Sequence, residues 1–449
     1  MKPIRICTND RCREEKDYLF DVVFNQYLGL PYELDFTLSA HETRLSTIDG
    51  EITFPDIFFG IAARSWLDKS LLPNPNMGCL KPLPEYDIFS PGEDISYFTW
   101  GDDKRFDPFG NIFFCISRIE ESITQPDNSA RFPYAASTLG KMLKKPIVNY
   151  WIEAMWSQVP GRERYQRRKN EFRPEITHDV DNLSSNLGRA GAKSLKIIAG
   201  DVLKRRDIGL ARRRTLAMVS ECFGLGSFRD PIANIENLSS IYRQQGISAK
   251  FYFMCMLQED VIAYRYDVGC HKPLIGKLIE DGHEIGIHPY FDTFKNPERL
   301  SEQLIYLNAV LSEYNVEAIG GRQHGLEWVP ETWRHWSSVG LKYDSSVYFA
   351  EEAGFRSGCC FDHSTYDVIK RRKLPLIERP LVLMDTTFES YKSVGQEEKQ
   401  SEVGALISEC RKFGGTFRVL FHNCKLISEK QKRFFKWTLN EAGLEFSWL

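Results

Sequence analysis

From residue 174 onward the sequence alternates regularly between segments of strand length and of helix length, and this order most constrains the fold. The apolar runs AKFYFMC (249–255) and HEIGIH (283–288) are followed by the helix-like segments 273–282 and 296–315. Repeated β–α units predict an α/β fold with a parallel sheet, either doubly wound or closed into a barrel. In such folds the functional site lies at the C-terminal ends of the strands.

The first part of the chain is expected to form a smaller accessory α/β domain over residues 1–165. A length of 449 residues makes two domains the natural expectation. The run PIRICT (3–8) predicts a strand, and the apolar spacing of NIFFCISRIEESI (111–123) predicts one helix. The charged, proline-ended segment 161–174 is the expected linker to a second domain over 166–449.

The bulk composition excludes some classes of partner and favours a cytoplasmic protein. A net charge of -3 gives no general attraction to nucleic acid, so no nucleic-acid partner is expected. Charges interrupt the first 20 residues before an apolar run of signal-peptide length, and no window approaches the ~20 apolar residues of a membrane span. Eleven cysteines without a Cys-x-x-Cys pair favour a reduced, intracellular chain.

Two carboxylates end the predicted strand PEITHDVD (174–181). Side chains alternate along a strand, so Asp179 and Asp181 can face the same way. Adjacent carboxylates repel each other unless a cation or a shared proton relieves them, so one can hold a metal while the other acts as a base. An Asp at a strand end is also a common helix N-cap, and this pair alone leaves both interpretations open.

Histidines end or follow two further predicted strands. His288 ends 283–288 and is followed by Pro and Tyr290, a candidate substrate contact; neutral imidazole suits Zn, Fe, Co or Ni. If the strand predicted for AIGGRQH (318–324) is regular, Arg322 and His324 share a face. Arg322 could then orient a carboxylate, and His324 could bind metal or substrate.

Polar residues also follow two later apolar runs. His422 ends VLFH (419–422), and a histidine with a near-neutral pKa is a suitable general acid for an amine leaving group. Asp385 follows RPLVLM (379–384) and is a candidate substrate contact, as is Trp328, whose ring could stack on a sugar. Five polar strand ends in one α/β domain predict a metal-assisted hydrolytic site.

These motifs resemble those of the polysaccharide deacetylase family (the NodB-homology group, carbohydrate esterase family four). The resemblance covers residues 174–449, and its motifs are THDVD (177–181), GHEIGIH (282–288), Arg322 and LFH (420–422). Segments 111–121, 343–347, 354–358 and 379–388 resemble a divergent branch with an uncharacterised N-terminal domain. The resemblance implies a deformed (β/α) barrel and a divalent metal cofactor, with Zn favoured over Co, Ni or Fe.

The resemblance also implies the roles of individual residues. It assigns Asp179 as the base, Asp181 and His288 as metal ligands, Arg322 as the group that orients the base, and His422 as the acid. The family has a second metal-binding His four residues after the first, where this chain has Asp292. Asp292 and His324 are therefore the two candidates for the third ligand.

The expected function is hydrolysis of N-acetyl, or less favourably O-acetyl, groups on a sugar or glycan. One alternative is a hydrolase of another non-peptide C–N bond, such as a cyclic amide, and the other is a catalytically silent carbohydrate-binding or scaffold protein. The basic, amphipathic insertion 182–232 either contacts an anionic membrane surface or forms a solvated helical pair. The sequence predicts no oligomeric state.

Overall fold

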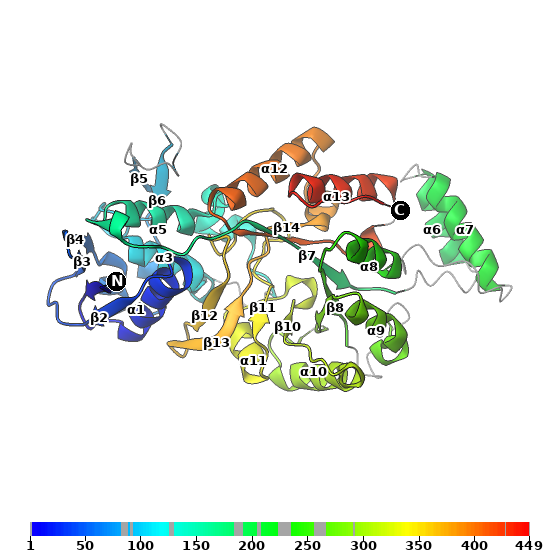
Figure 1. Cartoon of the computed structure of the whole chain (residues 1–449), viewed down its shortest axis with the longest axis horizontal. Coiled ribbons are helices and arrows are strands. Elements are labelled where there is room, and N and C mark those ends of the chain that lie inside the picture. The colour runs from blue at the N-terminus through cyan, green and yellow to red at the C-terminus, as the bar shows by residue number, and fades with distance from the viewer. Residues whose placement is uncertain are drawn as a thin grey trace. The chain divides into compact units, whose positions relative to one another are not determined.

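The chain divides into two compact units in the computed structural model. Figure 1 labels the helices and strands of the whole chain. The structure describes residues 2–81, 89, 93–124, 130–183, 192–203, 208–222, 235–255, 266–290, 292–426 and 428–448. Unit 1 comprises Met1–Arg173, Leu326–Val382 and Ala405–Phe417, and unit 2 comprises Pro174–Gly325, Leu383–Gly404 and Arg418–Leu449. The division into continuous domains at residues 165 and 166 stays a prediction.

Unit 1 combines short strands with helices, as the apolar runs of its first segment predict. Its strands are β1 (Ile4–Cys7), β2 (Tyr32–Asp35), β3 (Glu42–Thr47), β4 (Gly50–Pro55), β5 (Gly78–Leu80), β6 (Ile95–Tyr97), β11 (Tyr343–Asp344), β12 (His363–Asp367) and β13 (Arg372–Glu378). Its α-helices are α1 (Arg13–Phe20), α2 (Ile57–Ala62), α3 (Pro108–Ile116), α4 (Ile119–Thr124), α5 (Ile147–Ser157) and α11 (Thr332–Ser338). Strands β2-β1-β3-β4 form one sheet, in which β1 and β2 run parallel.

The single helix predicted over 111–123 is wrong in one respect, because the chain forms α3 and α4 with a break at Arg118. Arg118 has φ 57°, which interrupts helical geometry. Its buried guanidinium donates to Glu121 Oε1 at 2.6 Å and to the carbonyl of Arg356 at 2.6 Å. Apolar spacing does not predict this break in the helix, because the break depends on the buried Arg118 and not on the apolar pattern.

Unit 2 contains the strands that the β–α alternation predicts. They are β7 (Arg173–Val180), β8 (Lys250–Phe253), β9 (Glu284–Ile287), β10 (Gly320–Gly321), β14 (Leu383–Met384) and β15 (Thr416–Leu420), although β7 and β15 begin in unit 1. Their order in the sheet is β10-β9-β8-β7-β15-β14. The pairs β7–β8, β8–β9, β9–β10 and β14–β15 all run parallel. The α/β prediction is thereby confirmed.

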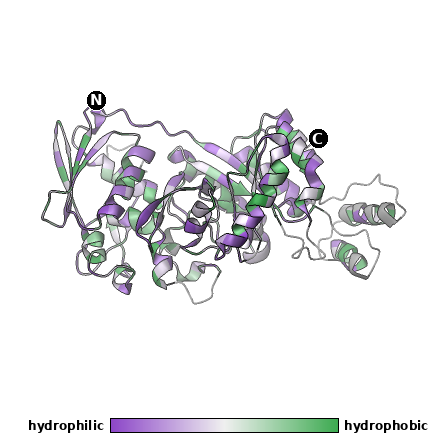
Figure 2. Ribbon diagram, turned by 90° about the horizontal axis from the view of Figure 1, so that it is seen from below, coloured by the Kyte–Doolittle hydropathy of each residue, from purple (hydrophilic) through white to green (hydrophobic). Residues whose placement is uncertain are grey.

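Helices separate these strands along the chain. They are α6 (Ala192–Leu203), α7 (Ile208–Cys222), α8 (Ile235–Gln244), α9 (Lys272–Glu280), α10 (Pro297–Leu311) and α13 (Glu429–Glu441), while α12 (Gln396–Lys412) crosses the division between the units. Hydrophobic and hydrophilic segments alternate along many of the helices (Figure 2). None of the helices within the described ranges combines the length and hydropathy needed to span a membrane.

The backbones of β9 and β10 approach each other closely at their C-terminal ends. Gly321 pairs with Ile287, and a Cβ built on Gly321 would lie 1.8 Å from the carbonyl oxygen of Ile287. Any larger residue at this position would therefore push the two strands apart. The glycine keeps the residues that follow the two strands, His288 and Arg322, next to each other.

The insertion 182–232 contains α6 and α7, which pack against each other. A buried ion pair between Arg214 and Asp201 at 3.2 Å joins them. Several apolar side chains on this pair are exposed, with Leu203 and Ile208 at 76% and 74%. Residues 184–191, 204–207 and 223–234 lie outside the described ranges. Membrane contact and a solvated pair both stay predictions for this segment.

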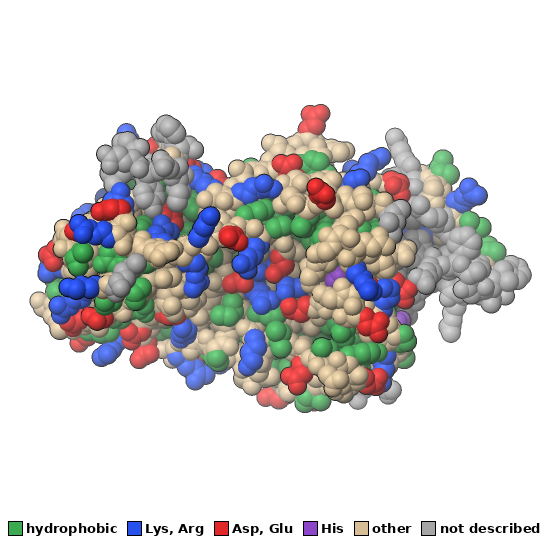
Figure 3. All heavy atoms as spheres, viewed as in Figure 1, with side chains coloured by type: hydrophobic (Ala, Val, Ile, Leu, Met, Phe, Trp, Pro, Cys, Tyr) green, Lys and Arg blue, Asp and Glu red, His purple; other side chains and the backbone are tan. Residues whose placement is uncertain are grey.

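Positive and negative side chains are interspersed over the face of the molecule that Figure 3 shows. This mixture agrees with the small net charge of -3.

Candidate metal centre and catalytic site

Parallel strands place the polar residues that follow them at one edge of the sheet in unit 2. Asp181 directly follows β7, His288 follows β9, Arg322 follows β10 and Asp385 follows β14. His422 comes two residues after the end of β15. This edge is the carboxyl end of the strands, where α/β folds carry their sites.

Three side chains at this edge are close enough together to hold a metal ion. They are the one group of acidic and histidine residues with this spacing in the part of the chain that the structure describes. One ligand atom from each of Asp181, His288 and His324 lies within 4.8 Å of the others. His288 Nε2 is 3.3 Å from Asp181 Oδ1, and His324 Nδ1 is 3.1 Å from His288 Nε2. Two imidazole nitrogens and one carboxylate oxygen form a donor set that suits Zn and related divalent ions.

The second nitrogen of His288 fixes which atom faces the centre. His288 Nδ1 lies 2.7 Å from the backbone carbonyl oxygen of Arg322, which can only accept, so Nδ1 carries the proton and donates. Nε2 is then left as the lone-pair donor that points at Asp181 and His324. Metal-ligating histidines are held in this way by an acceptor on the opposite ring nitrogen.

The charge state of Asp181 also fits a metal ligand. Burial alone would raise the pKa of Asp181, but the imidazoles of His288, His422 and His324 beside it hold the pKa well below its usual range. The carboxylate is therefore ionised at neutral pH, as a ligand must be.

Asp179 lies beside this group and is held by Arg322. Arg322 Nη1 donates to Asp179 Oδ1 at 2.8 Å and to Thr177 Oγ1 at 2.9 Å, and both charged groups are buried. Asp179 Oδ2 is 3.7 Å from His288 Nε2. The guanidinium therefore fixes the orientation of the carboxylate.

Thr177 and Tyr252 position Arg322 and were not singled out from the sequence. Thr177 Oγ1 donates to the carbonyl of Val419 at 2.8 Å, and the Arg322 guanidinium lies 5.1 Å from the centroid of the Tyr252 ring. Thr177 shares the strand face of Asp179 by the period of two, so a search of that face would have found it.

His422 and Asp385 form a second hydrogen-bonded pair at the same edge. His422 Nδ1 donates to Asp385 Oδ1 at 2.7 Å, and the backbone NH of His422 donates to Asp385 Oδ2 at 2.8 Å. His422 Nε2 lies 4.0 Å from Asp181 Oδ2, so this nitrogen faces the centre. Burial lowers the pKa of His422, but the charge and hydrogen bond of Asp385 outweigh it and raise the pKa to about 10.

Three further predicted residues do not belong to the Asp181, His288 and His324 group. Asp292 is exposed, has φ 68° and is not part of the Asp181, His288 and His324 cluster. Trp328 is fully buried and packs edge-on against Trp333 with ring centroids 4.8 Å apart, which leaves no ring face for a sugar. Tyr290 is 8% exposed, with its ring centroid 5.9 Å from that of His324.

Two comparisons with known proteins give matches. Residues 4–162 match the model of a family of unknown function, DUF7033. Because that match ends at residue 162, the strands that carry the site lie outside it. No curated protein matches the chain significantly.

Two solved structures are similar to the chain at low identity. One, from Mycobacterium smegmatis, is described as a "putative polysaccharide deacetylase"; it has 16% identity, a TM-score of 0.39, and covers 62% of this chain and 85% of its own. The other, from Bordetella bronchiseptica, carries the same description with involvement in O-antigen biosynthesis; it has 11% identity, a TM-score of 0.30, and covers 60% and 80%. At these TM-scores the fold rests on the strand order given above.

Proposed function

We propose that the chain is a divalent-metal-dependent hydrolase that removes N-acetyl, or less favourably O-acetyl, groups from a carbohydrate. The observation that carries this proposal is the convergence of Asp181, His288 and His324 beside the Arg322-held Asp179 and the Asp385-held His422. The proposal includes Zn as the favoured ion. It also includes closure of the unit 2 strands into the deformed (β/α) barrel that the motifs imply.

Each side chain has a distinct task in this proposal. Asp181, His288 and His324 would hold a divalent ion, which would supply Lewis acidity toward the amide carbonyl and the attacking water. Asp179 accepts the proton of that water as it attacks the acetyl carbon, and Arg322 orients Asp179 through its hydrogen bond.

His422 then completes the reaction. Its Nε2 gives a proton to the nitrogen as the C–N bond breaks, which releases acetate and a free amino sugar. Asp385 is a positioning residue in this scheme, since both of its oxygens accept hydrogen bonds from His422. The earlier assignment of Asp385 to substrate binding is replaced by this role.

Acetate release tests the proposal directly. We expect a panel of N-acetylated sugars and glycans to include at least one that releases acetate, with activity lost in chelator and restored by Zn, Co or Ni. A cyclic amide in the panel covers the alternative C–N substrate. Protein that holds about one metal ion per chain but hydrolyses none of these substrates would contradict the deacetylase, and protein that binds no metal would favour a silent scaffold.

The pair of His422 and Asp385 predicts a specific pH dependence. The acid must be protonated to act, so activity falls as pH rises through the pKa of His422. Asp385 raises that pKa, so Asp385→Asn should move the alkaline limb of kcat to lower pH by about 1–3 units. The measurement is kcat against pH for both proteins.

A matched change elsewhere separates this effect from a general loss of negative charge. Asp267→Asn removes a carboxylate that hydrogen-bonds Tyr306 and is no part of the His422 pair. This control should keep the wild-type alkaline limb. An unchanged limb in Asp385→Asn would show that His422 is not the acid.

A further inference from the structure

A cavity of about 900 Å³ lies in unit 2, and most of its lining comes from the segments that follow Asp385 and His422 in the sequence. One wall is the π-helical turn Thr387–Tyr391, which begins two residues after Asp385, with the segment that leads into α12. The other wall is the first half of α13, which begins seven residues after His422. The volume is within the range of about 300–1,000 Å³ typical of ligand pockets.

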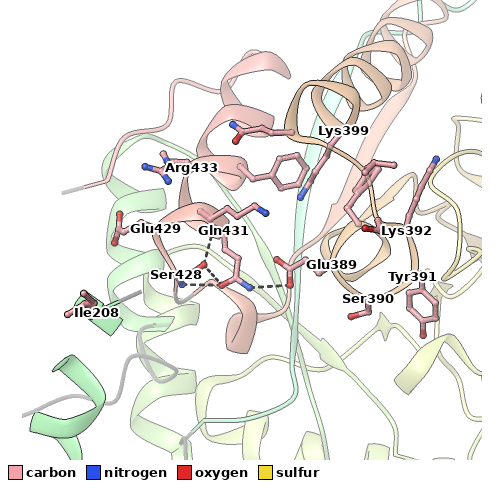
Figure 4. A pocket seen from close by; sticks show the side chains of 16 residues that line it. Ile208, Glu389, Ser390, Tyr391, Lys392, Lys399, Ser428, Glu429, Gln431 and Arg433 are labelled. Carbon is pink, nitrogen blue, oxygen red and sulfur yellow. Dashed lines mark hydrogen bonds between the residues drawn. The ribbon is translucent and has the colours of Figure 1, made fainter. Parts of the chain in front are cut away.

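Lys399 gives the cavity an unusual cation. Its Nζ lies 3.2 Å from the centroid of the Phe434 ring and 5.3 Å from that of Phe388, and both rings are largely buried. Lys399 forms no ion pair with any residue in the described ranges, whereas Lys392 in the same wall pairs with Glu402 at 2.8 Å. Figure 4 shows Lys399 and Glu389 extending into the same space.

The environment of Lys399 leaves its charge only partly compensated. Burial lowers the pKa of Lys399 to about 8, although Glu389 and Asp385 act in the opposite direction. Aromatic faces attract a cation but do not replace a carboxylate. A partly desolvated ammonium that forms no direct ion pair is stabilised by an anion that binds from solution.

The other residues that line the cavity indicate the charge and the chemical class of its ligand. Cations outnumber acids around the cavity, with Lys392, Lys399, Lys430 and Arg433 against Glu389 and Glu429. Gln431 Nε2 donates to Glu389 Oε2 at 3.1 Å, so one oxygen of this carboxylate is already hydrogen-bonded within the protein. Hydroxyl and amide groups of Ser390, Ser393 and Gln396, with the half-exposed ring of Tyr391, suit a sugar.

We propose that this cavity binds an anionic group of the saccharide substrate, a carboxylate or a phosphate, with Lys399 as its principal cation. The proposal rests on the proposed function for the identity of the ligand as a saccharide. It names the substrate class as acidic sugars: uronic acids or sugar phosphates. Lys399 is a substrate-binding residue here and takes no part in proton transfer.

Calorimetric binding to metal-free protein tests the cavity without turnover and without anions ligating the metal. The probes are N-acetylglucosamine 1-phosphate, an N-acetylated uronic acid and neutral diacetylchitobiose. Lys399→Met keeps an unbranched chain against the two rings, and Lys436→Met on the same α13 is the control because Lys436 does not line the cavity. We expect Lys399→Met to bind the anionic probes about ten- to a hundredfold more weakly and the neutral probe unchanged.

Proton uptake gives a second readout that a merely structural lysine would not change. An anion in contact with Lys399 raises the pKa of its ammonium, so binding at pH 8 should take up protons in the wild type. The enthalpy of binding then depends on the ionisation heat of the buffer, and this dependence should vanish in Lys399→Met and persist in Lys436→Met. The tighter of the two anionic probes identifies the source of the charge.

The outcomes for the cavity and for the proposed function are separate. Equal affinity for neutral and anionic probes, binding of neither, or equal weakening by both variants would overturn the cavity assignment. A charge preference that depends on Lys399 in a protein that releases no acetate would keep the cavity assignment as an anion site and refute the deacetylase.

Discussion

Replacement of Asp179 by Asn is expected to abolish turnover while the protein keeps its metal. The amide has nearly the shape of the carboxylate but cannot accept a proton from water. General bases contribute about 10²–10⁴-fold to rate, so kcat should fall by at least this range. Asp181, His288 and His324 are unchanged, so metal content per chain should equal that of the wild type. Acetate release and elemental analysis on one preparation provide both values.

Protein stability is the main confounding factor for Asp179→Asn. Arg322 is buried and would keep only an amide oxygen in place of its carboxylate, which costs some stability. The thermal midpoint must therefore remain above the assay temperature. Glu284→Gln removes a carboxylate that pairs with Lys250 at the opposite end of the same strands, and it should retain turnover. Turnover retained in Asp179→Asn would show that another group is the base.

The strand ends of unit 2 could be predicted from the sequence because parallel pairing leaves little freedom there. Apolar runs locate β7, β9 and β15, and one edge must then carry the residues that follow them. Asp181, His288 and His422 lie at this edge for that reason. The contact between Asp179 and Arg322 follows from the same geometry, since β10 ends directly before Arg322.

The residues beyond the strands could not be placed in this way. The predicted strand over 318–324 ends at Gly321, and His324 begins a 3₁₀ turn, so the period of two does not apply to Arg322 and His324. Arg322 and His324 nevertheless contact Asp179 and His288, because a turn that apolar spacing does not predict brings them there. The cavity around Lys399 is equally hidden, because its walls come from turns and helix starts after two different strands.

Buried polar networks account for the other differences. Trp328 looks like a sugar platform by residue type, but it is buried against Trp333 and Arg356. Arg118 ends α3 through its contacts with Glu121 and the carbonyl of Arg356. In both cases the decisive partner is more than 200 residues away or belongs to a buried cluster. A local pattern contains no information about such partners.

The second prediction with a large expected effect concerns metal affinity and distinguishes His324 from Asp292 as the third ligand. We expect His324→Ala to weaken metal binding by on the order of 10²-fold or more, since loss of even an outer-shell partner costs 10–100-fold. The structure supports this expectation because His324 Nδ1 is 3.1 Å from His288 Nε2, whereas Asp292 is exposed and outside the cluster. Competition against a chromophoric chelator measures the affinity for Zn.

Asp292→Ala is the matched variant, because it removes the residue that stands at the family's second histidine position. It should bind Zn as the wild type does, and it should keep wild-type turnover at saturating metal. His324→Ala should recover part of its turnover at high metal concentration, because Asp179 and His422 remain in place. The opposite pattern, with affinity lost in Asp292→Ala and kept in His324→Ala, would move the third ligand to Asp292. It would also require the turn at Asp292 to rearrange when the metal binds, since its present φ of 68° accompanies an exposed side chain.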